Sequence, residues 1–233
     1  MFQRYRVLLI LLSTCHMVHA ETGTQELQRK MFEAAEAANW KALEHAVAKG
    51  ADPRGRTLLH WAAGEGHTAD VRRLIENGAN TGVKDDSGWT PLALAAFAGE
   101  AEAARTLIEH GAEIEPKDNV GNTPLHLAAS AGYKEVTKIL LEKGADIEAT
   151  NQKGWTPLFS AVTNYRHPNL VNWFLRMGAD ATARSKAEKT PLDVAIEQRN
   201  EAIALAEKEE PTPKWIRDRV KGYTAIVKIL ETQ

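Results

Sequence analysis

A short phrase that begins with threonine recurs along the chain at a nearly constant interval. Its copies begin at Thr57, Thr90, Thr123, Thr156 and Thr190. The intervals between these threonines are 33, 33, 33 and 34 residues. A fixed period of roughly 20 to 50 residues is typical of a solenoid, in which each unit packs mainly on its neighbours. This period constrains the fold more strongly than any other feature of the sequence.

The clearest copy, GNTPLHLAASAG at Gly121–Gly132, has the features of a helix start. A threonine at the N-cap accepts hydrogen bonds from backbone amides that lack a helical partner, and a proline at the first helical position loses no bond. A second helix follows, because Val136, Ile139 and Leu140 recur at the spacing of one apolar helix face. Gly144 then supplies the left-handed residue that ends a helix. Each period therefore predicts a pair of helices.

Three copies of the phrase resemble the ankyrin repeat: TLLHWAA at Thr57, TPLALAA at Thr90 and TPLHLAA at Thr123. The resemblance extends from about Leu27 to the end of the chain. It implies an all-α solenoid of about six helix-pair repeats, joined by short β-hairpin fingers. It also implies that His60 and His126, within the TLLH and TPLH phrases, have structural roles.

Both ends of the repeat region depart from the pattern. Leu27–Gly50 predicts a helix pair without the TPL phrase, which is typical of an N-terminal cap. The closing repeat begins at Thr190, and two interpretations of its second helix stay open. In the first, GYTAIVKILE from Gly222 is that helix and residues 199–221 are an insertion. In the second, residues 200–210 form it and a further helix is added. We favour the insertion because it places apolar side chains on the buried face.

The first twenty residues have the composition of a secretory signal peptide. Arg4 and Arg6 precede an apolar run at residues 7–12, and a small-residue exit ends at Ala20. This order of basic, apolar and small residues predicts export and a mature domain at 21–233. The apolar run is far shorter than the roughly 20 residues that a membrane-spanning helix needs.

Three forms of the amino terminus stay open. Cleavage after Ala20 would leave the protein in the periplasm. The sequence LSTC at Leu12–Cys15 also resembles a bacterial lipobox, in which Cys15 is acylated and anchors the protein to a membrane facing the periplasm. An internal start at Met31 would give an unexported form. Because Cys15 is the only cysteine, the folded domain forms no internal disulfide.

Several classes of function are disfavoured by what the sequence lacks. The formal net charge of −2 gives no general attraction to nucleic acid. The histidines do not follow the HExxH spacing of a zinc site, and neither a GxSxG phrase nor a phosphate-binding glycine loop occurs. We therefore predict a protein that is not an enzyme and that requires neither a metal nor a cofactor.

The remaining candidates for function are surface residues. In ankyrin proteins the tips of the fingers and the exposed side of the first helix of each repeat bind other proteins. Carried over by position, the candidate partner-binding residues are Arg54, Arg56, Glu65, Asp86, Trp89, Phe97, Asn119, Asn122, Gln152, Lys153, Trp155 and Asn164. Trp89 and Trp155 occupy the same slot two repeats apart, where they either anchor a partner or pack on a neighbouring finger. Trp215, within 199–221, is a further candidate that either covers the last repeat or contacts a partner.

These observations predict a non-enzymatic protein-binding module of the bacterial envelope. The most specific hypothesis is an immunity protein that covers the active cleft of a toxic secreted effector, for example a lipase. One alternative is a scaffold or stabiliser of an envelope enzyme. Another is an ankyrin effector directed at a host. Each hypothesis rests on analogy, because a fold by itself does not determine a function.

Overall fold

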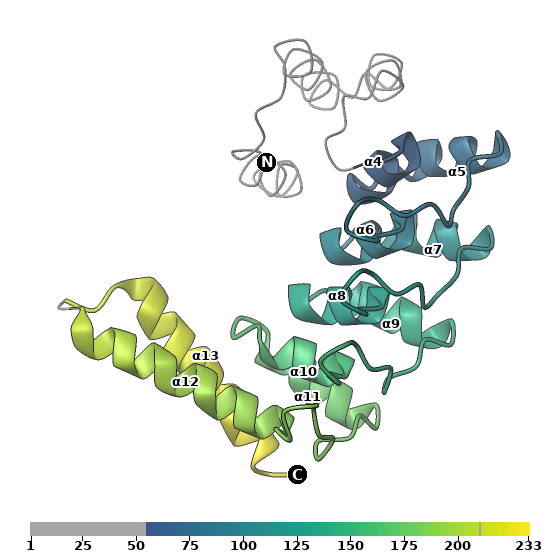
Figure 1. The fold of residues 1–233 in the computed structure, drawn as a ribbon. Helices are drawn as coiled ribbons and strands as arrows, with labels where there is room; N and C mark the ends of the chain where they lie inside the picture. Colours follow the sequence, from purple (N-terminus) through teal and green to yellow (C-terminus); the bar gives the residue numbers. More distant parts are fainter. Residues whose placement is uncertain (1–54, 210) are drawn as a thin grey trace. The chain divides into compact units, whose positions relative to one another are not determined.

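The computed structural model describes residues 55–209 and 211–233. These residues form ten helices, which follow one another in pairs (Figure 1). The predicted signal peptide, Cys15, the N-terminal cap and Arg54 lie outside the described residues. An all-α repeat fold is therefore confirmed for the part of the chain that is described.

The chain divides into two compact units, of which the first ends at Asn119. Its described helices are α4 (Leu58–Gly64), α5 (Thr68–Glu76), α6 (Pro91–Ala98) and α7 (Ala101–Glu109). The first helices of the two pairs, α4 and α6, pack on each other, and so do the second helices, α5 and α7. The small side chains of Ala62, Ala63, Ala95 and Ala96 are fully buried, which lets the backbones of α4 and α6 approach closely.

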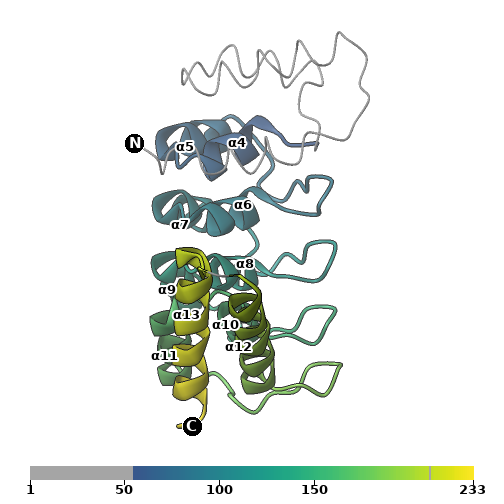
Figure 2. The ribbon, with the colours of Figure 1, turned by 90° about the vertical axis from the view of Figure 1, so that its left-hand side faces the viewer.

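The second unit begins at Val120 and repeats this arrangement. Its helices are α8 (Pro124–Ala131), α9 (Lys134–Glu142), α10 (Pro157–Val162), α11 (Pro168–Arg176), α12 (Pro191–Lys208) and α13 (Lys214–Leu230). The first helices pack in the order α8, α10, α12, and α11 packs on α13 (Figure 2). The buried faces of the second helices carry the apolar residues predicted for them, for example Ile139 and Leu140 on α9.

The threonine phrases start the first helices, as predicted. Thr90 accepts a hydrogen bond from the backbone amide of Ala93, and a proline follows it at the first helical position. Where histidine stands in the third position, it links neighbouring repeats. Nε2 of His60 lies 3.0 Å from the carbonyl oxygen of Trp89, and Nε2 of His126 lies 2.8 Å from that of Trp155. The structural role of these two histidines is confirmed.

The fingers between repeats differ from the expected β-hairpins, because no strand is assigned among residues 55–209 and 211–233. The fingers at Asp85 and Asn151 are closed by a side chain in addition to one backbone hydrogen bond, which runs from the amide of Asp85 to the carbonyl of Trp89 and from that of Asn151 to the carbonyl of Trp155. Oδ1 of Asp85 accepts hydrogen bonds from the amides of Ser87 and Trp89, and Oδ1 of Asn151 accepts from those of Lys153 and Trp155. These side-chain bonds satisfy amides that a longer strand ladder would otherwise pair.

The closing repeat is a long helical hairpin. Residues 199–221 form the end of α12, a turn and the start of α13. Helix α12 runs without a break through Arg199 and Asn200, and α13 is the helix that packs on α11. The phrase from Gly222 onward therefore occupies the position of a second helix, with Ile226, Val227 and Leu230 buried.

Candidate functional site

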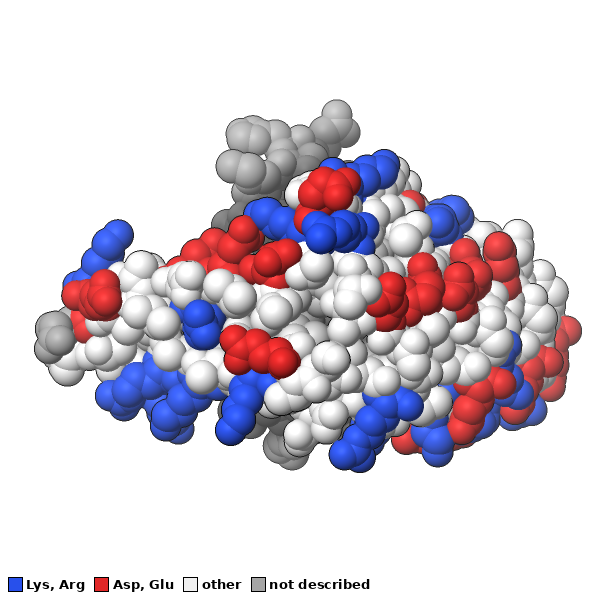
Figure 3. Space-filling model, turned by 90° about the horizontal axis from the view of Figure 1, so that it is seen from below, with Lys and Arg blue, Asp and Glu red and all other residues white. Residues whose placement is uncertain are grey.

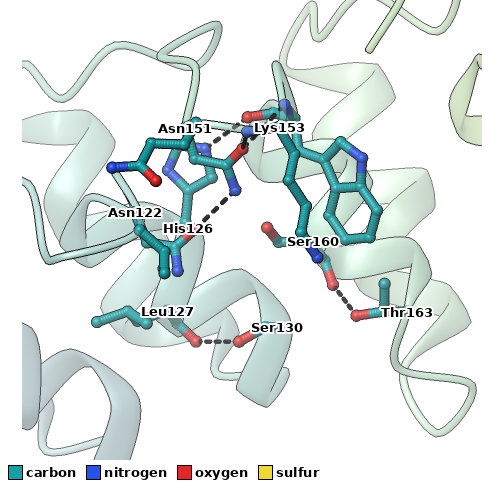
Figure 4. Close-up of a pocket in the computed structure, with 11 residues that line it drawn as sticks. Asn122, His126, Leu127, Ser130, Asn151, Lys153, Ser160 and Thr163 are labelled. Carbon is teal, nitrogen blue, oxygen red and sulfur yellow. Dashed lines mark hydrogen bonds between the residues drawn. The ribbon is translucent and has the colours of Figure 1, made fainter. Parts of the chain in front are cut away.

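A hollow of about 290 Å³ lies in the second unit, between two fingers and the first helices next to them (Figure 4). We call it the groove. Its lining combines apolar, amide and hydroxyl side chains: Val120, Asn122, His126, Leu127, Ser130, Asn151, Gln152, Lys153, Trp155, Ser160 and Thr163. Lys153 is the only Lys, Arg, Asp or Glu among them. The groove therefore presents mainly apolar surface, set among amide and hydroxyl groups, with Lys153 at its rim.

Trp155 forms one wall of the groove and is held there by the core. Its ring lies nearly parallel to that of Phe159, with the two centroids 5.9 Å apart. Phe159 is completely buried, so it gives Trp155 a rigid support. Nζ of Lys153 lies 4.9 Å from the centroid of Trp155, within range of a cation–π interaction. The half-buried indole and the ammonium group thus form one composite surface.

The rim of the groove is organised by amides from two adjacent repeats. Nδ2 of Asn151 donates to Oδ1 of Asn122 at 2.8 Å, which ties one finger to the preceding one. The hydrogen bond between His126 and the backbone carbonyl of Trp155 is a second link between the same two repeats. Both the side chain and the backbone of Trp155 are consequently fixed before any partner arrives, which lowers the entropy that binding must overcome.

The far end of the groove is held by the irregular loop at residues 163–168, which contains the extra residue of the 34-residue repeat. Nδ2 of Asn164 donates to the carbonyl oxygen of Ser130 at 2.9 Å. The hydroxyl of Tyr223 on α13 donates to the carbonyl oxygen of Thr163 at 2.8 Å. The closing hairpin therefore helps to position a residue that lines the groove.

Gly222 makes this contact between α13 and the loop possible, because a Cβ atom at this position would overlap the carbonyl oxygen of Tyr165. We expect Gly222→Ala to lower the free energy of unfolding by about 1–3 kcal/mol, the range for overpacked sites. Urea unfolding followed by circular dichroism would measure the loss. The exposed neighbour Thr224 provides the control, since Thr224→Ala should change stability by less than about 0.5 kcal/mol. Equal stability of the two variants would contradict the proposed packing.

The first unit contains a second tryptophan in the same slot. Trp89 packs on Phe97, with ring centroids 5.0 Å apart and planes tilted by 54°, and its Nε1 donates to Asp118 at 3.2 Å. Both Trp89 and Trp155 are half-buried. Each therefore packs within its own unit and also leaves part of its ring exposed.

The other candidate residues differ widely in exposure. Arg56 is 5 % exposed, and its Nε donates to Oδ2 of Asp85 at 3.1 Å, so burial removes it from the surface available to a partner. The exposed candidates at finger tips are Asp86, Asn119, Gln152 and Lys153. Glu65, Asn122 and Asn164 are half-buried. Trp215 is 55 % exposed, which does not fit a role as a cover for the last repeat.

Sequence reasoning did not select Leu127, Ser160 and Thr163 as binding residues, although they line the groove. Leu127 and Ser160 belong to ordinary first helices, and nothing in their sequence context distinguishes them from core positions. Thr163 begins the loop with the extra residue, and that irregularity was a usable signal.

Two glutamates in the first unit have unusual electrostatics. Burial, together with the nearby charge of Glu100, raises the pKa of Glu65 to about 7. Burial also raises the pKa of Glu100. Oε1 of Glu65 is buried without a hydrogen-bond partner. The protonated form of Glu65 is therefore favoured in the folded protein at mildly acidic pH.

This raised pKa predicts that stability falls as pH rises. The unfolded chain loses the Glu65 proton near pH 4.5, whereas the folded protein retains it up to about pH 7. The folded state thus binds more protons between these values, and the free energy of unfolding decreases across that window. We expect a decrease of roughly 2 kcal/mol after allowing for partial solvent screening. Urea unfolding at several pH values would measure this decrease. In the Glu65→Gln variant the free energy of unfolding should depend much less on pH across the same window. An unchanged pH dependence in that variant would contradict this assignment.

The described residues contain no group of three or more His, Cys, Asp or Glu side chains that could hold a metal ion. Within the same residues, the helices are too short or too polar to cross a bilayer.

The chain matches the family model of ankyrin repeats, described as three copies, over residues 31–118 and 115–185. The chain belongs to the ankyrin-repeat family. Ankyrin proteins typically act as non-enzymatic protein-interaction modules, and the groove lies among the fingers and first helices that such proteins use. A curated relative is the 26S proteasome non-ATPase regulatory subunit 10 of Rattus norvegicus, 40% identical over 47 residues. This match spans 20% of the present chain and 20% of the length of that protein.

Proposed function

We propose that this ankyrin protein binds another protein through the groove and the finger tips beside it. The observation that carries the proposal is the composite surface of Trp155 and Lys153, which Phe159 supports at the wall of the groove. An aromatic residue with a fixed ring and a polar surround is typical of an interface hot spot. The binding would be non-catalytic: of the two titratable side chains in the lining, His126 is held by hydrogen bonds to Thr123 and to the carbonyl of Trp155, and Lys153 lies over the ring of Trp155.

The finer proposal is that the protein is exported and acts as an immunity protein in the bacterial envelope. The basic and apolar order of residues 1–20 supports export, either free in the periplasm or anchored by lipid at Cys15. An exported binder needs a target outside the cytoplasm, and a toxic effector such as a lipase is such a target. The mechanism would be occlusion: the groove and fingers would cover the active cleft of the effector and exclude its substrate.

A pull-down from envelope extract, followed by mass spectrometry of the captured proteins, tests the binding proposal. The wild-type protein should retain a specific partner. Trp155→Ala should weaken its affinity by about 2 kcal/mol, or roughly thirty-fold, as for other hot-spot residues. Trp173→Ala is the matched control, because Trp173 is half-buried on α11 and does not line the groove. Equal affinity of the two variants would remove the groove from the proposal.

The identity of the captured protein tests the finer proposal. A toxic effector whose activity is inhibited on binding would support an immunity protein. A housekeeping envelope enzyme that is stabilised without inhibition would instead support a scaffold, and recovery of the protein outside the envelope would support a host-directed effector. Mass spectrometry of the mature amino terminus would distinguish lipid at Cys15 from cleavage after Ala20.

A further inference from the structure

Helix α13 concentrates positive charge in a protein whose formal net charge is −2. It carries five Lys or Arg and one Asp, a net charge of +4. Its partner α12 carries two basic and four acidic residues, a net charge of −2. The two helices of the closing hairpin therefore present opposite signs of charge to solvent.

Four of the cations on α13 form a single row: Lys214, Arg217, Lys221 and Lys228. At about 100° per residue they fall within a sector of roughly 60°, and the rise of about 1.5 Å per residue spreads them over roughly 20 Å. All four are exposed. Asp218, the acidic residue of α13, falls outside this sector by the same geometry. We call these four residues the basic row.

The basic row is not neutralised by the parts of the chain that the structure describes. The ion pairs found there leave out all four of its members. Arg217 donates to the carbonyl oxygen of Thr212, which leaves its charge uncompensated. Arg219, which points elsewhere on the same helix, is instead paired with Glu201 at 3.5 Å. The row is thus available to an anionic partner.

Exposed apolar side chains also occur near the tip of the same hairpin. Five large hydrophobic residues are exposed among the described residues, and three of them lie in the last turns of α12 and the first turn of α13. These three are Ile203 (37 %), Leu205 (37 %) and Trp215 (55 %). By the same helix geometry Trp215 lies about 100° from Lys214 and outside the sector of the basic row, so the face of α13 that carries the row is polar.

The acidic residues of the hairpin limit which edge can face an anionic surface. Glu207 and Glu209 are exposed near the tip, and Glu197 and Glu201 lie along α12. In Figure 3 the arm formed by α12 and α13 extends to the left, with Lys and Arg gathered along its lower edge and most acidic side chains above them. An anionic plane would therefore attract the α13 edge and repel the α12 edge, which fixes the orientation of the hairpin.

We propose that the basic row of α13 rests on the headgroups of an anionic phospholipid bilayer. A bilayer fits this row because its four cations lie along about 20 Å of one helix face, which suits the extended array of phosphates on an anionic membrane surface. Each Lys or Arg near an anionic bilayer strengthens binding by roughly 5-fold. The basic row would thus give the protein a second binding surface, on a different element of the fold from the groove.

The test uses the full chain and vesicles of phosphatidylcholine, with or without phosphatidylglycerol, in a sedimentation assay. Wild-type protein should bind the anionic vesicles more tightly and should be released as salt is raised. The triple variant Lys214→Gln, Arg217→Gln, Lys221→Gln should lose affinity for anionic vesicles on the order of 100-fold. Trp215→Ala should leave the affinity for anionic vesicles nearly unchanged, because Trp215 lies outside the sector of the basic row.

The matched control is Lys143→Gln, Arg176→Gln, Lys186→Gln, which removes the same charge from exposed positions outside α13. It should bind anionic vesicles nearly as tightly as wild type, and this comparison also separates α13 from Arg4 and Arg6 near the amino terminus. Circular dichroism would check that every variant is folded. Equal losses in the two triple variants, or equal binding of wild type to neutral and anionic vesicles, would overturn the proposal. Binding to nucleic acid or to an acidic protein in place of vesicles would also overturn it.

Discussion

Arg56→Ala is expected to lower the free energy of unfolding of the first unit by about 3–5 kcal/mol, the range for breaking a buried ion pair. The side chains of Arg56 and Asp85 are 4 % and 0 % exposed, and 3.1 Å separates Nε from Oδ2. Removing the guanidinium would leave the carboxylate buried without its counter-charge. The same carboxylate closes a finger through Ser87 and Trp89, so that finger should also loosen. Urea unfolding would report the global loss, and hydrogen exchange at the two finger amides would report the local one.

Two variants separate this effect from a simple loss of charge. Arg72→Ala removes an exposed cation from α5 and should change stability by less than about 0.5 kcal/mol. The double variant Arg56→Met, Asp85→Asn removes both charges but retains an oxygen that can accept the finger amides. It should be more stable than Arg56→Ala, because it leaves no unpaired charge in the interior. A double variant less stable than the single variant would contradict the assigned role of the pair.

Phe159→Ala is expected to have an effect of similar size, about 3–5 kcal/mol, because a large aromatic side chain would be lost from the core. Phe159 is 0 % exposed and supports the ring of Trp155. Its removal should therefore also weaken the binding of any partner in the groove. Urea unfolding and affinity for the captured partner would measure the two effects separately.

Phe174→Ala is the control for the second effect. Phe174 is also 0 % exposed, but its ring contacts Trp173 on α11 instead of Trp155. The two variants should lose comparable stability, while only Phe159→Ala should reduce partner affinity at temperatures where both are folded. Equal partner affinities of the two variants would show that binding in the groove does not depend on the packing of Phe159 against Trp155.

The repeat, its helix pairs and the roles of His60 and His126 could be predicted because they depend on contacts between nearby residues or between equivalent positions of adjacent repeats. Thr90 caps its helix through an amide three residues away, and Gly132 adopts the left-handed conformation at a helix end. The fingers were harder to predict. Asp85 and Asn151 close them with side chains, and a sequence pattern does not show whether a short turn will be closed by a side chain or by strand pairing.

The candidate site could be predicted only in part. Four of the predicted partner-binding residues line the groove: Asn122, Gln152, Lys153 and Trp155. Arg56 is instead turned inward, because a buried carboxylate from the next repeat lies beside it. Position in a repeat predicts the average exposure of a slot. It does not predict with which residue of the next repeat a long side chain will form a hydrogen bond or an ion pair.

The sequence by itself determined the period, the start and end of most helices, and therefore the class of fold, because capping and helix periodicity act over a few residues. Tertiary structure alone decided that residues 199–221 extend two helices into one hairpin and that Tyr223 and Gly222 hold the loop at 163–168. It also decided that the four cations of the basic row form no ion pair with the other residues that the structure describes. These features join residues as many as 60 positions apart, and packing between such distant segments leaves no periodic trace in the chain.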